Sequence, residues 1–389
     1  MDIKGDFYRF SRLYKRAITA LLITVFLFCS VFACSGVRTL IRRQKIENSE
    51  PRWSEGDIYY NHLPARQQLL YDAVSEAVED LTLNTKTLPY YFSEDELNTV
   101  LIFLLADHPE YFYLNSARCV LKNGWNCSGV RLSYYGNAES VSAMREEYSR
   151  TLNEAYDAVG RKATEYQTAL ALHDYLITRS SAAEGSGICD TAYGPLVNRN
   201  GSSLGYAQAY QALLKRFGME CYTVFGKAGQ SSVAWNLMKT DGSYYHTDVL
   251  SDDPDWEESV LFHGFFGLDD AEMLAYRTLT YEGIHPAADA PSSYYAQNGL
   301  EAGTVSQMRA VLTEQLKAQA ALGGRFIELR ISFSNDIRLF EDMIGEAISS
   351  ANRSGLPVTI RDTFRVFTST ATNGAATIEI FYIDTPKAE

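Results

Sequence analysis

The sequence lacks several patterns that would assign it to a common functional class. None of its six cysteines forms a C-x-x-C pair, which disfavours a cysteine-ligated zinc site. No segment repeats with a period of 20–50 residues, which argues against solenoids and propellers. The acidic run over 252–258 lacks the D-x-[DN]-x-[DN]-G pattern of a calcium loop, so we expect a solvated turn there. We therefore expect neither a metal nor a cofactor.

Beyond residue 45 the chain also lacks basic charge. This part holds 26 Lys and Arg against 46 Asp and Glu, a net charge of −20. An acidic body does not attract nucleic acid or anionic lipid through its own field, so we predict no nucleic-acid partner. The length of 389 residues, with 46% hydrophobic and 21% charged residues, is typical of two or three globular domains.

The first 45 residues differ from the rest. They hold nine Lys and Arg against two Asp, and these charges flank an uncharged stretch over residues 17–37. A stretch of this length can cross a bilayer as a helix, whereas the apolar part of a cleaved signal peptide has only about 7–15 residues. We predict a cytoplasmic tail and membrane anchor in residues 1–45, with the bulk of the chain outside the cytoplasm.

Two alternatives to an uncleaved anchor stay open. The segment 31–36, with the sequence VFACSG, is similar to a bacterial lipoprotein processing site in which Cys34 would carry the lipid. Simple secretion after cleavage of a signal peptide is the other alternative. In each case we expect the body of the protein outside the cytoplasm.

Four cysteines lie beyond this segment. Cys119 and Cys127 flank the hairpin signal Asn123-Gly124, so they either form a disulfide across a hairpin or remain free and buried. Cys189 is either structural or bonded to Cys221, and a displaced nucleophile is its least favoured role.

Hydrophobic periodicity predicts a mixture of helices and strands in three regions after a polar spacer. Residues 46–150 form a region of helices and a hairpin, which includes a capping-box pattern at Ser93 and Glu96. Residues 285–300 resemble a linker. Helices are predicted at 66–81, 93–108, 140–159, 164–177, 204–217, 304–322 and 336–352, and strands at 111–121, 130–135, 220–226, 233–239, 243–249, 325–333, 358–368 and 376–383.

Three motifs follow one another in the central region. They are SLGYA at 203–207, VAWN at 233–236 and YHTDV at 245–249, with His173-Asp174 before them and Asp252-Asp253-Pro254 after them. Over roughly residues 55–300, this pattern resembles the bacterial transglutaminase-like family, whose motifs are C-x-G-Y-A, H-A-W-N and Y-H-x-D-x-T-W.

The resemblance implies an α+β fold with a papain-like core. In such a core the helix that carries the nucleophile packs on an antiparallel sheet. We assign this transglutaminase-like domain to residues 151–290, preceded by an N-terminal α+β extension and followed by a small α+β domain at 301–389.

In the family, a cysteine at a helix N-terminus attacks a carboxamide, a histidine on the next strand takes its proton, and an aspartate orients that histidine. The matching positions here hold Ser203, Val233 and Asp248, and Leu250 and Ser251 replace the family's Thr and Trp. Valine accepts no proton, and loss of the base in a triad enzyme costs on the order of 10⁶ in turnover. We therefore expect a degenerate, inactive triad.

Other positions of the motifs are candidates for substrate binding, namely Tyr206, Trp235, Asn236 and His246. His246 is also the nearest substitute base, although a structural histidine is the favoured interpretation. His173 is expected to serve in packing or hydrogen bonding. Without an imidazole to orient, Asp248 is expected to pair with backbone donors or stay solvated.

Three functions fit these features. The first is a membrane-tethered pseudoenzyme that binds peptide or protein, for instance cell-wall peptide, without catalysis. The second is an active hydrolase or acyltransferase with a rearranged site based on Ser203. The third is a structural scaffold in which the C-terminal domain makes the contacts.

Overall fold

The computed structural model describes residues 49–122, 126–253, 261–290, 293–331, 337–368 and 375–382. Within these ranges the chain forms two compact units, one with residues up to Trp53, 63–101 and 117–132, and the other with 54–62, 102–116 and the chain from Ser133 onwards. The predicted anchor at 17–37 lies outside the described residues. No helix in the described ranges is long and apolar enough to span a bilayer.

The first unit contains helix α3 (Ala65–Glu79) and most of helix α4 (Glu94–Asp107) and of the hairpin β1 (Leu114–Lys122) and β2 (Asn126–Tyr134). The predicted capping box is confirmed: Ser93 Oγ accepts from Glu96 N at 3.0 Å, and Glu96 Oε2 accepts from Ser93 N at 2.8 Å. Two otherwise unsatisfied backbone donors at the start of α4 are thereby paired.

Cys119 and Cys127 join β1 to β2 through a disulfide, which confirms the first of the two alternatives. Cys189 and Cys221 are free, so the predicted alternative of a bond between them is wrong. The turn signal Asn123-Gly124 lies outside the described residues.

The second unit is built on a five-stranded antiparallel sheet with the order β8-β7-β6-β5-β9. Its three long strands match the predicted ones, while the two short outer strands were not predicted. The strands are β5 (Cys221–Ala228), β6 (Ser231–Thr240), β7 (Ser243–Thr247), β8 (Phe266–Leu268) and β9 (Thr278–Leu279).

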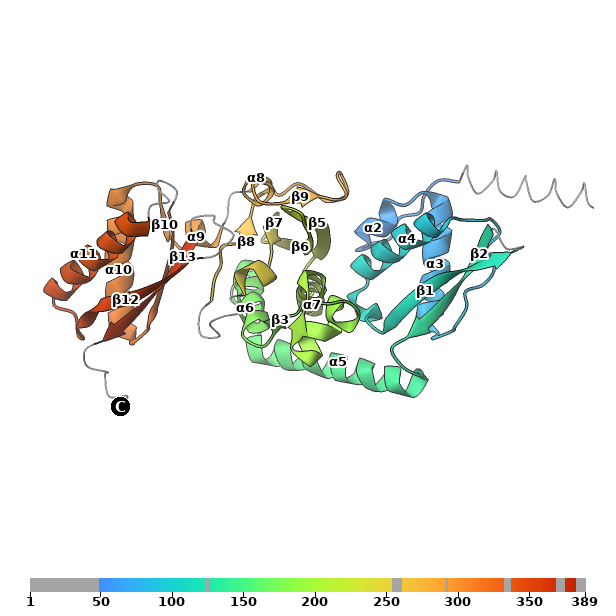
Figure 1. Cartoon of the computed structure of the whole chain (residues 1–389), viewed down its shortest axis with the longest axis horizontal. Helices are drawn as coiled ribbons and strands as arrows, with labels where there is room; N and C mark the ends of the chain where they lie inside the picture. Colours follow the sequence, from blue (N-terminus) through green and yellow to red (C-terminus); the bar gives the residue numbers. More distant parts are fainter. Residues whose placement is uncertain are drawn as a thin grey trace, which may run out of the picture. The chain divides into compact units, whose positions relative to one another are not determined.

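Helices α6 (Glu165–Ile177) and α7 (Ser203–Arg216) lie on one face of this sheet, and α5 (Ala138–Val159) packs against both of these helices (Figure 1). Helix α7 packs directly on β5 and β6, and the Tyr210 hydroxyl donates to Ala169 O of α6 at 2.9 Å. An apolar cluster that includes Trp235, Leu237 and Phe265 covers the other face. The α+β class is thus confirmed, as is the expected packing of the helix that begins at Ser203 on an antiparallel sheet.

A second sheet, with the order β10-β11-β13-β12, lies near the C-terminus. Helices α10 (Val305–Leu322) and α11 (Ile337–Arg353) pack on it around one apolar core (Figure 1). The strands are β10 (Glu301–Ala302), β11 (Phe326–Ile331), β12 (Ile360–Thr368) and β13 (Ala375–Tyr382). These elements follow the predicted order, with β10 as an addition.

The segment predicted as a linker, residues 285–300, is packed instead. It contains helix α9 (Tyr294–Gln297), and Ala288 and Tyr295 are completely buried. The linker interpretation is therefore wrong for the described residues of this segment, because Ala288 and Tyr295 pack in the interior. The remaining short helices and strands are α2 (Ile58–Asn61), β3 (Ser181–Ala182), β4 (Asn200–Gly201) and α8 (Asp270–Leu274).

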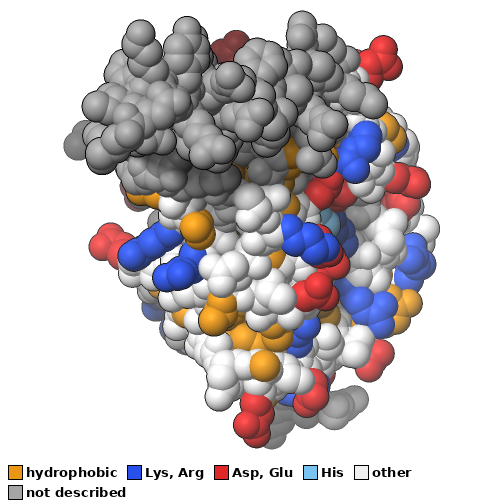
Figure 2. Space-filling view, turned by 90° about the vertical axis from the view of Figure 1, so that its right-hand side faces the viewer, with side chains coloured by type: hydrophobic (Ala, Val, Ile, Leu, Met, Phe, Trp, Pro, Cys, Tyr) orange, Lys and Arg blue, Asp and Glu red, His pale blue; other side chains and the backbone are white. Residues whose placement is uncertain are grey.

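On the face seen in Figure 2, acidic and basic side chains alternate with small apolar areas. The acidic excess is not gathered into one patch on this face. A mixed surface of this kind does not generate the single-sign field that attracts a strongly charged partner.

The domain boundaries at 150, 290 and 301 remain predictions.

Candidate functional site

Ser203 begins helix α7, directly after the N-cap residue Ser202, whose side chain accepts from Gly205 N at 3.3 Å. The Ser203 hydroxyl accepts from Ala234 N of β6, also at 3.3 Å. The structure therefore brings Ser203, the predicted nucleophile position, next to the strand residue that follows Val233, the predicted base position. Val233 supplies no group that can take a proton from Ser203.

A close approach of two backbone segments explains why the SLGYA motif has glycine at its third position. A Cβ atom on Gly205 would lie 2.1 Å from the carbonyl oxygen of Cys189, and the same oxygen accepts from Ser202 N at 3.1 Å. The first turn of α7 therefore packs backbone to backbone against residues 188–190. This contact fixes the position of Ser203.

Asp248, the third triad position, is buried and forms an ion pair with Arg277. Arg277 Nη2 donates to Asp248 Oδ2 at 2.7 Å, and the Ser251 hydroxyl donates to the same oxygen at 2.8 Å. Ser251 N also donates to Asp248 Oδ1 at 3.2 Å. The expected backbone donor is thus present, but the expectation of a solvated carboxylate is wrong, because a buried guanidinium neutralises it.

His246 does not act on Ser203 in this arrangement. Its Nδ1 accepts from Trp235 Nε1 at 3.0 Å, and its Nε2 donates to Asp270 Oδ1 at 2.8 Å, so both ring nitrogens are occupied. Burial lowers the pKa of His246 below its usual value, against the opposing effect of Asp270. These contacts are those of a structural histidine.

The other predicted ligand-binding residues are buried as well. Trp235 packs in the apolar cluster, Asn236 donates from Nδ2 to Ala207 O at 2.8 Å, and the Tyr206 hydroxyl donates to Asp253. Side chains in these positions stabilise the packing of α7 on the sheet. Their role in ligand binding remains a prediction.

All six histidines lie in the described part of the chain, and within it none hydrogen-bonds Ser203. His62 contacts Ile58 O, and His108 contacts Glu110. His285 is packed against Tyr59, and burial lowers its pKa to about 4. His173 and His263 belong to a separate cluster.

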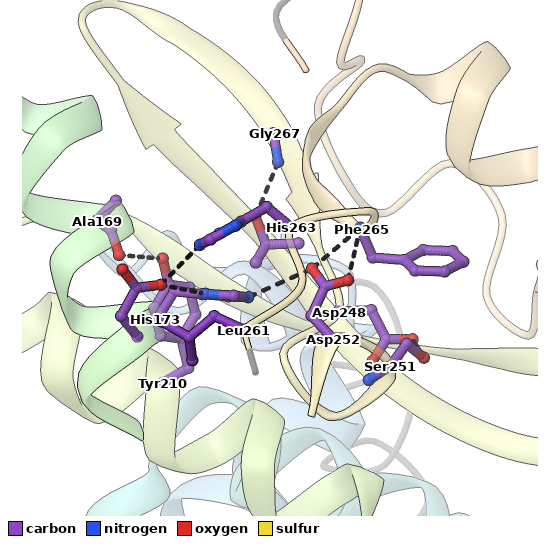
Figure 3. A network of polar contacts seen from close by, with 12 residues as sticks. Ala169, His173, Tyr210, Asp248, Ser251, Asp252, Leu261, His263, Phe265 and Gly267 are labelled. Carbon is purple, nitrogen blue, oxygen red and sulfur yellow. Dashed lines mark hydrogen bonds and ion pairs between the residues drawn. The ribbon is translucent and has the colours of Figure 1, made fainter. Parts of the chain in front are cut away.

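That cluster, which we call the histidine–carboxylate cluster, consists of His173, Asp174, Asp252, His263 and Glu328. Figure 3 shows His173, Asp252 and His263 in it. Asp174 Oδ1 lies 3.0 Å from His173 Nδ1 and 2.9 Å from His263 Nε2. The hydrogen-bonding role expected for His173 is confirmed. The motifs contained His173, Asp174 and Asp252, but nothing in the sequence pointed to His263 or Glu328.

The cluster shifts the pKa values of its members in opposite directions. Burial alone would lower the pKa of His263, but the carboxylates of Glu328 and Asp174 outweigh it and raise that pKa to about 10. The pKa of His173 is raised although burial opposes it, because Asp174 and Asp252 face the ring. Burial raises the pKa of Asp252, whereas in Asp174 the two histidines overcome burial and lower the pKa.

The acidic run after the third motif is not uniformly solvated. Asp252 is completely buried, and both of its oxygens accept from Phe265 N at 3.0 Å. For this residue the predicted solvated turn is wrong, since a histidine and a backbone donor surround its carboxylate. Residues 254–260 lie outside the described residues.

Comparisons with known proteins give partial structural similarities. No protein-family model and no curated protein matches the chain. A crystal structure of a candidate cysteine protease from Cytophaga hutchinsonii shares 15% identity with a TM-score of 0.25, covering 35% of this chain and 62% of that one. A candidate protease from Parabacteroides distasonis ATCC 8503 shares 11% identity with a TM-score of 0.22, covering 34% and 36%.

A transglutaminase structure shares 10% identity with a TM-score of 0.27, covering 56% of this chain and 65% of that one. The chain thus spans less than two thirds of each of the three structures. Similarity at this level establishes no activity, and the architecture described above rests on the chain's own elements.

The buried ion pair predicts a large loss of stability when one partner is removed. Arg277→Met should lower the free energy of unfolding by about 3–5 kcal/mol, because Asp248 then remains buried without a cation. Adding Asp248→Leu to this variant should recover much of the loss, since both charges are then absent. Urea unfolding monitored by Trp fluorescence measures both effects.

Arg309→Met is the matched control, because Arg309 forms an exposed ion pair with Glu346. Such pairs contribute at most about 1 kcal/mol. Equal, small losses for the two arginine variants would show that the pair at Asp248 is not buried in solution.

Proposed function

We propose that this chain is a membrane-tethered, extracytoplasmic pseudoenzyme of the transglutaminase-like type, which binds peptide or protein without catalysis. One observation carries the proposal: Val233 stands at the base position while Asp248 is held by Arg277. Neither group can accept a proton from Ser203, because valine has no basic atom and the aspartate is engaged in a buried ion pair. The hydroxyl alone is a weak nucleophile.

A cavity in the second unit supports binding. It has a volume of about 340 Å³ and lies between α5, the end of α6 and the turn at 194–198. Its wall includes Arg150, Arg179 and Arg199, and also Glu147 and Glu154, both of which pair with Arg150. Arg179 and Arg199 are exposed, and Arg199 adopts a left-handed backbone conformation with φ of 60°. Non-glycine residues in this conformation concentrate at functional sites.

The arginines indicate the chemistry of the ligand. Guanidinium groups bind carboxylates through two parallel hydrogen bonds, so an extended peptide with a free carboxylate fits this cavity. Cell-wall peptide is an example of such a ligand. The turn at 194–198 leads through β4 to Ser203, so the cavity belongs to the same part of the fold as the former nucleophile position.

A structural scaffold is the second candidate. It is favoured by the contacts of Arg330 of β11, whose Nη2 lies 2.6–2.8 Å from oxygens of Glu272, Ser293 and Glu301. These contacts fasten the C-terminal sheet to the segments before it, as a scaffold requires. In this case the arginine-lined cavity would bind no peptide, and the binding experiment below distinguishes the two functions.

The absence of a base predicts no turnover. Wild-type protein and Ser203→Ala should be equally inactive in hydrolysis of glutamine-containing peptides and in amine incorporation into them. Mass spectrometry of the peptides after long incubation measures both reactions. Turnover by the wild type that Ser203→Ala abolishes would establish the alternative of an active hydrolase or acyltransferase.

The cavity predicts carboxylate-dependent binding. Arg199→Gln and Arg179→Gln should each weaken binding of a synthetic cell-wall stem peptide about 10-fold or more, the effect of losing a hydrogen bond to a charged group. Calorimetry with the free-acid peptide and its C-terminally amidated form provides the matched ligand pair. Arg216→Gln, on an exposed part of α7 outside the cavity, is the control variant. Failure of the wild type to bind either peptide or any surface protein favours the scaffold.

Export predicts the redox state of the cysteines. The full chain should fractionate with membranes and contain an oxidised Cys119–Cys127 bond, because disulfides persist outside the cytoplasm. A variant without residues 1–45 should stay in the cytosol, with both cysteines open to alkylation. Cys189 should alkylate in both proteins after unfolding and serves as the internal control. A soluble full-length chain with reduced Cys119 would contradict the tether.

A further inference from the structure

The histidine–carboxylate cluster has a geometry that the proposed binding function does not use. Three of its atoms converge on one point: His173 Nδ1 and His263 Nε2 face Asp174 Oδ1 at 3.0 and 2.9 Å. We call these three the inner atoms. All three lie within 4.8 Å of one another, although the residues come from α6 and from a loop 89 residues further along the chain.

The outer nitrogen of each ring faces a second carboxylate. His263 Nδ1 lies 2.9 Å from Glu328 Oε2. His173 Nε2 lies 3.3 Å from Asp252 Oδ2 (Figure 3). Asp252 is held in turn by Phe265 N, which donates to both of its oxygens. Histidines that bind metals commonly donate their second N–H to a carboxylate, which orients the ring and raises its basicity. His263 Nδ1 is hydrogen-bonded to Glu328, whereas His173 Nε2 is close to Asp252 without a well-aligned hydrogen bond.

The number of protons on the two imidazoles decides whether a metal cation can bind between them and Asp174. A neutral imidazole carries one N–H, and if that proton faces the outer carboxylate, the inner nitrogen presents a lone pair. The lone pairs of the two inner nitrogens would then face the Asp174 oxygen at 3.0 and 2.9 Å, and they would be repelled by it unless positive charge lay between them. Either two inner protons or one divalent cation supplies that charge, and both give the five side chains and their cations the same total of −1.

The two solutions differ in what they bury. The protonated form holds two imidazolium ions and three carboxylates in a region where His173 and Asp252 have no solvent exposure. Removing that many separate charges from water is costly. A single divalent cation bonded directly to the inner atoms leaves both rings neutral, with each outer N–H on a carboxylate.

We propose that His173 Nδ1, His263 Nε2 and Asp174 form a binding site for a divalent transition-metal ion, oriented by Asp252 and Glu328. Two imidazoles and one carboxylate form a ligand set that suits zinc and its first-row neighbours and does not suit Mg²⁺ or Ca²⁺, which prefer oxygen. On binding, the ion takes the place of the two inner protons, which leave for solvent.

The distances fit such an ion after a small adjustment. Tetrahedral ligands with bonds of about 2.1 Å lie about 3.4 Å apart, so each nitrogen would move only a few tenths of an ångström from Asp174. The Asp174 side chain is 33% exposed, which gives the ion a path from solvent and leaves a position for a fourth ligand. Through Glu328, the site would tie α6 and the loop at 261–265 to β11 of the C-terminal sheet.

Metal titration of the full-length protein, purified in detergent and stripped with a chelator, tests the site. We expect one Zn²⁺ per chain, unaffected by excess Mg²⁺ or Ca²⁺, and a visible Co²⁺ spectrum of low coordination number. Asp174→Asn should weaken Zn²⁺ binding at least 100-fold. Glu328→Gln, which keeps all three inner atoms, should weaken it 10–100-fold, the usual effect of losing a carboxylate behind a ligating histidine.

His246→Asn is the matched control, because His246 is also buried and also paired with a carboxylate, but lies outside the cluster. Its Zn²⁺ affinity should equal that of the wild type. Absence of stoichiometric Zn²⁺ from the wild type at micromolar concentrations, or unchanged affinity in both Asp174→Asn and Glu328→Gln, would assign the cluster to an ion-pair network held by protons. Because the readout is metal content and not peptide binding, it is independent of the proposed function.

Discussion

A carboxylate that is removed from water must face a cation or several hydrogen-bond donors, and this requirement shapes the interior of the second unit. Asp248 meets it with Arg277 and Ser251, and Asp252 meets it with His173 and Phe265 N. In a papain-like triad the aspartate would face the catalytic imidazole. Val233 stands at the position that the sequence motifs predict for that imidazole, and a guanidinium from a residue 29 positions further on neutralises the carboxylate.

Local patterns predicted most of the fold because they report on local physics. The capping box at Ser93 and Glu96 and the long strands of the central sheet follow from hydrogen bonding and periodicity within a few residues. Strands β8 and β9 have three and two residues, too few to show alternation. The segment 285–300 was mistaken for a linker because proline and glycine mark turns regardless of whether the turn is buried.

The sequence predicts some contacts of the candidate site and gives no sign of others. Motif spacing placed Ser203 beside the residue after Val233, and the 3.3 Å contact with Ala234 N agrees with it. Pairings between distant residues have no such signal. Arg277 and Glu328 are ordinary charged residues in the sequence, and only the packing of loops and a second sheet brings them to Asp248 and His263.

These pairings bear on whether substitutions at two positions could make the site reactive. Cysteine at 203 and histidine at 233 would supply a nucleophile and a base, but Asp248 would still be bound to Arg277 at 2.7 Å. The new imidazole would then compete with a guanidinium that is charged at every physiological pH. Removing Arg277 frees the aspartate only at the cost of an uncompensated buried charge until the imidazole takes its place. Arg277 thus satisfies the carboxylate of Asp248 independently of positions 203 and 233, so a reactive triad at these positions would also require a change in the packing around Asp248.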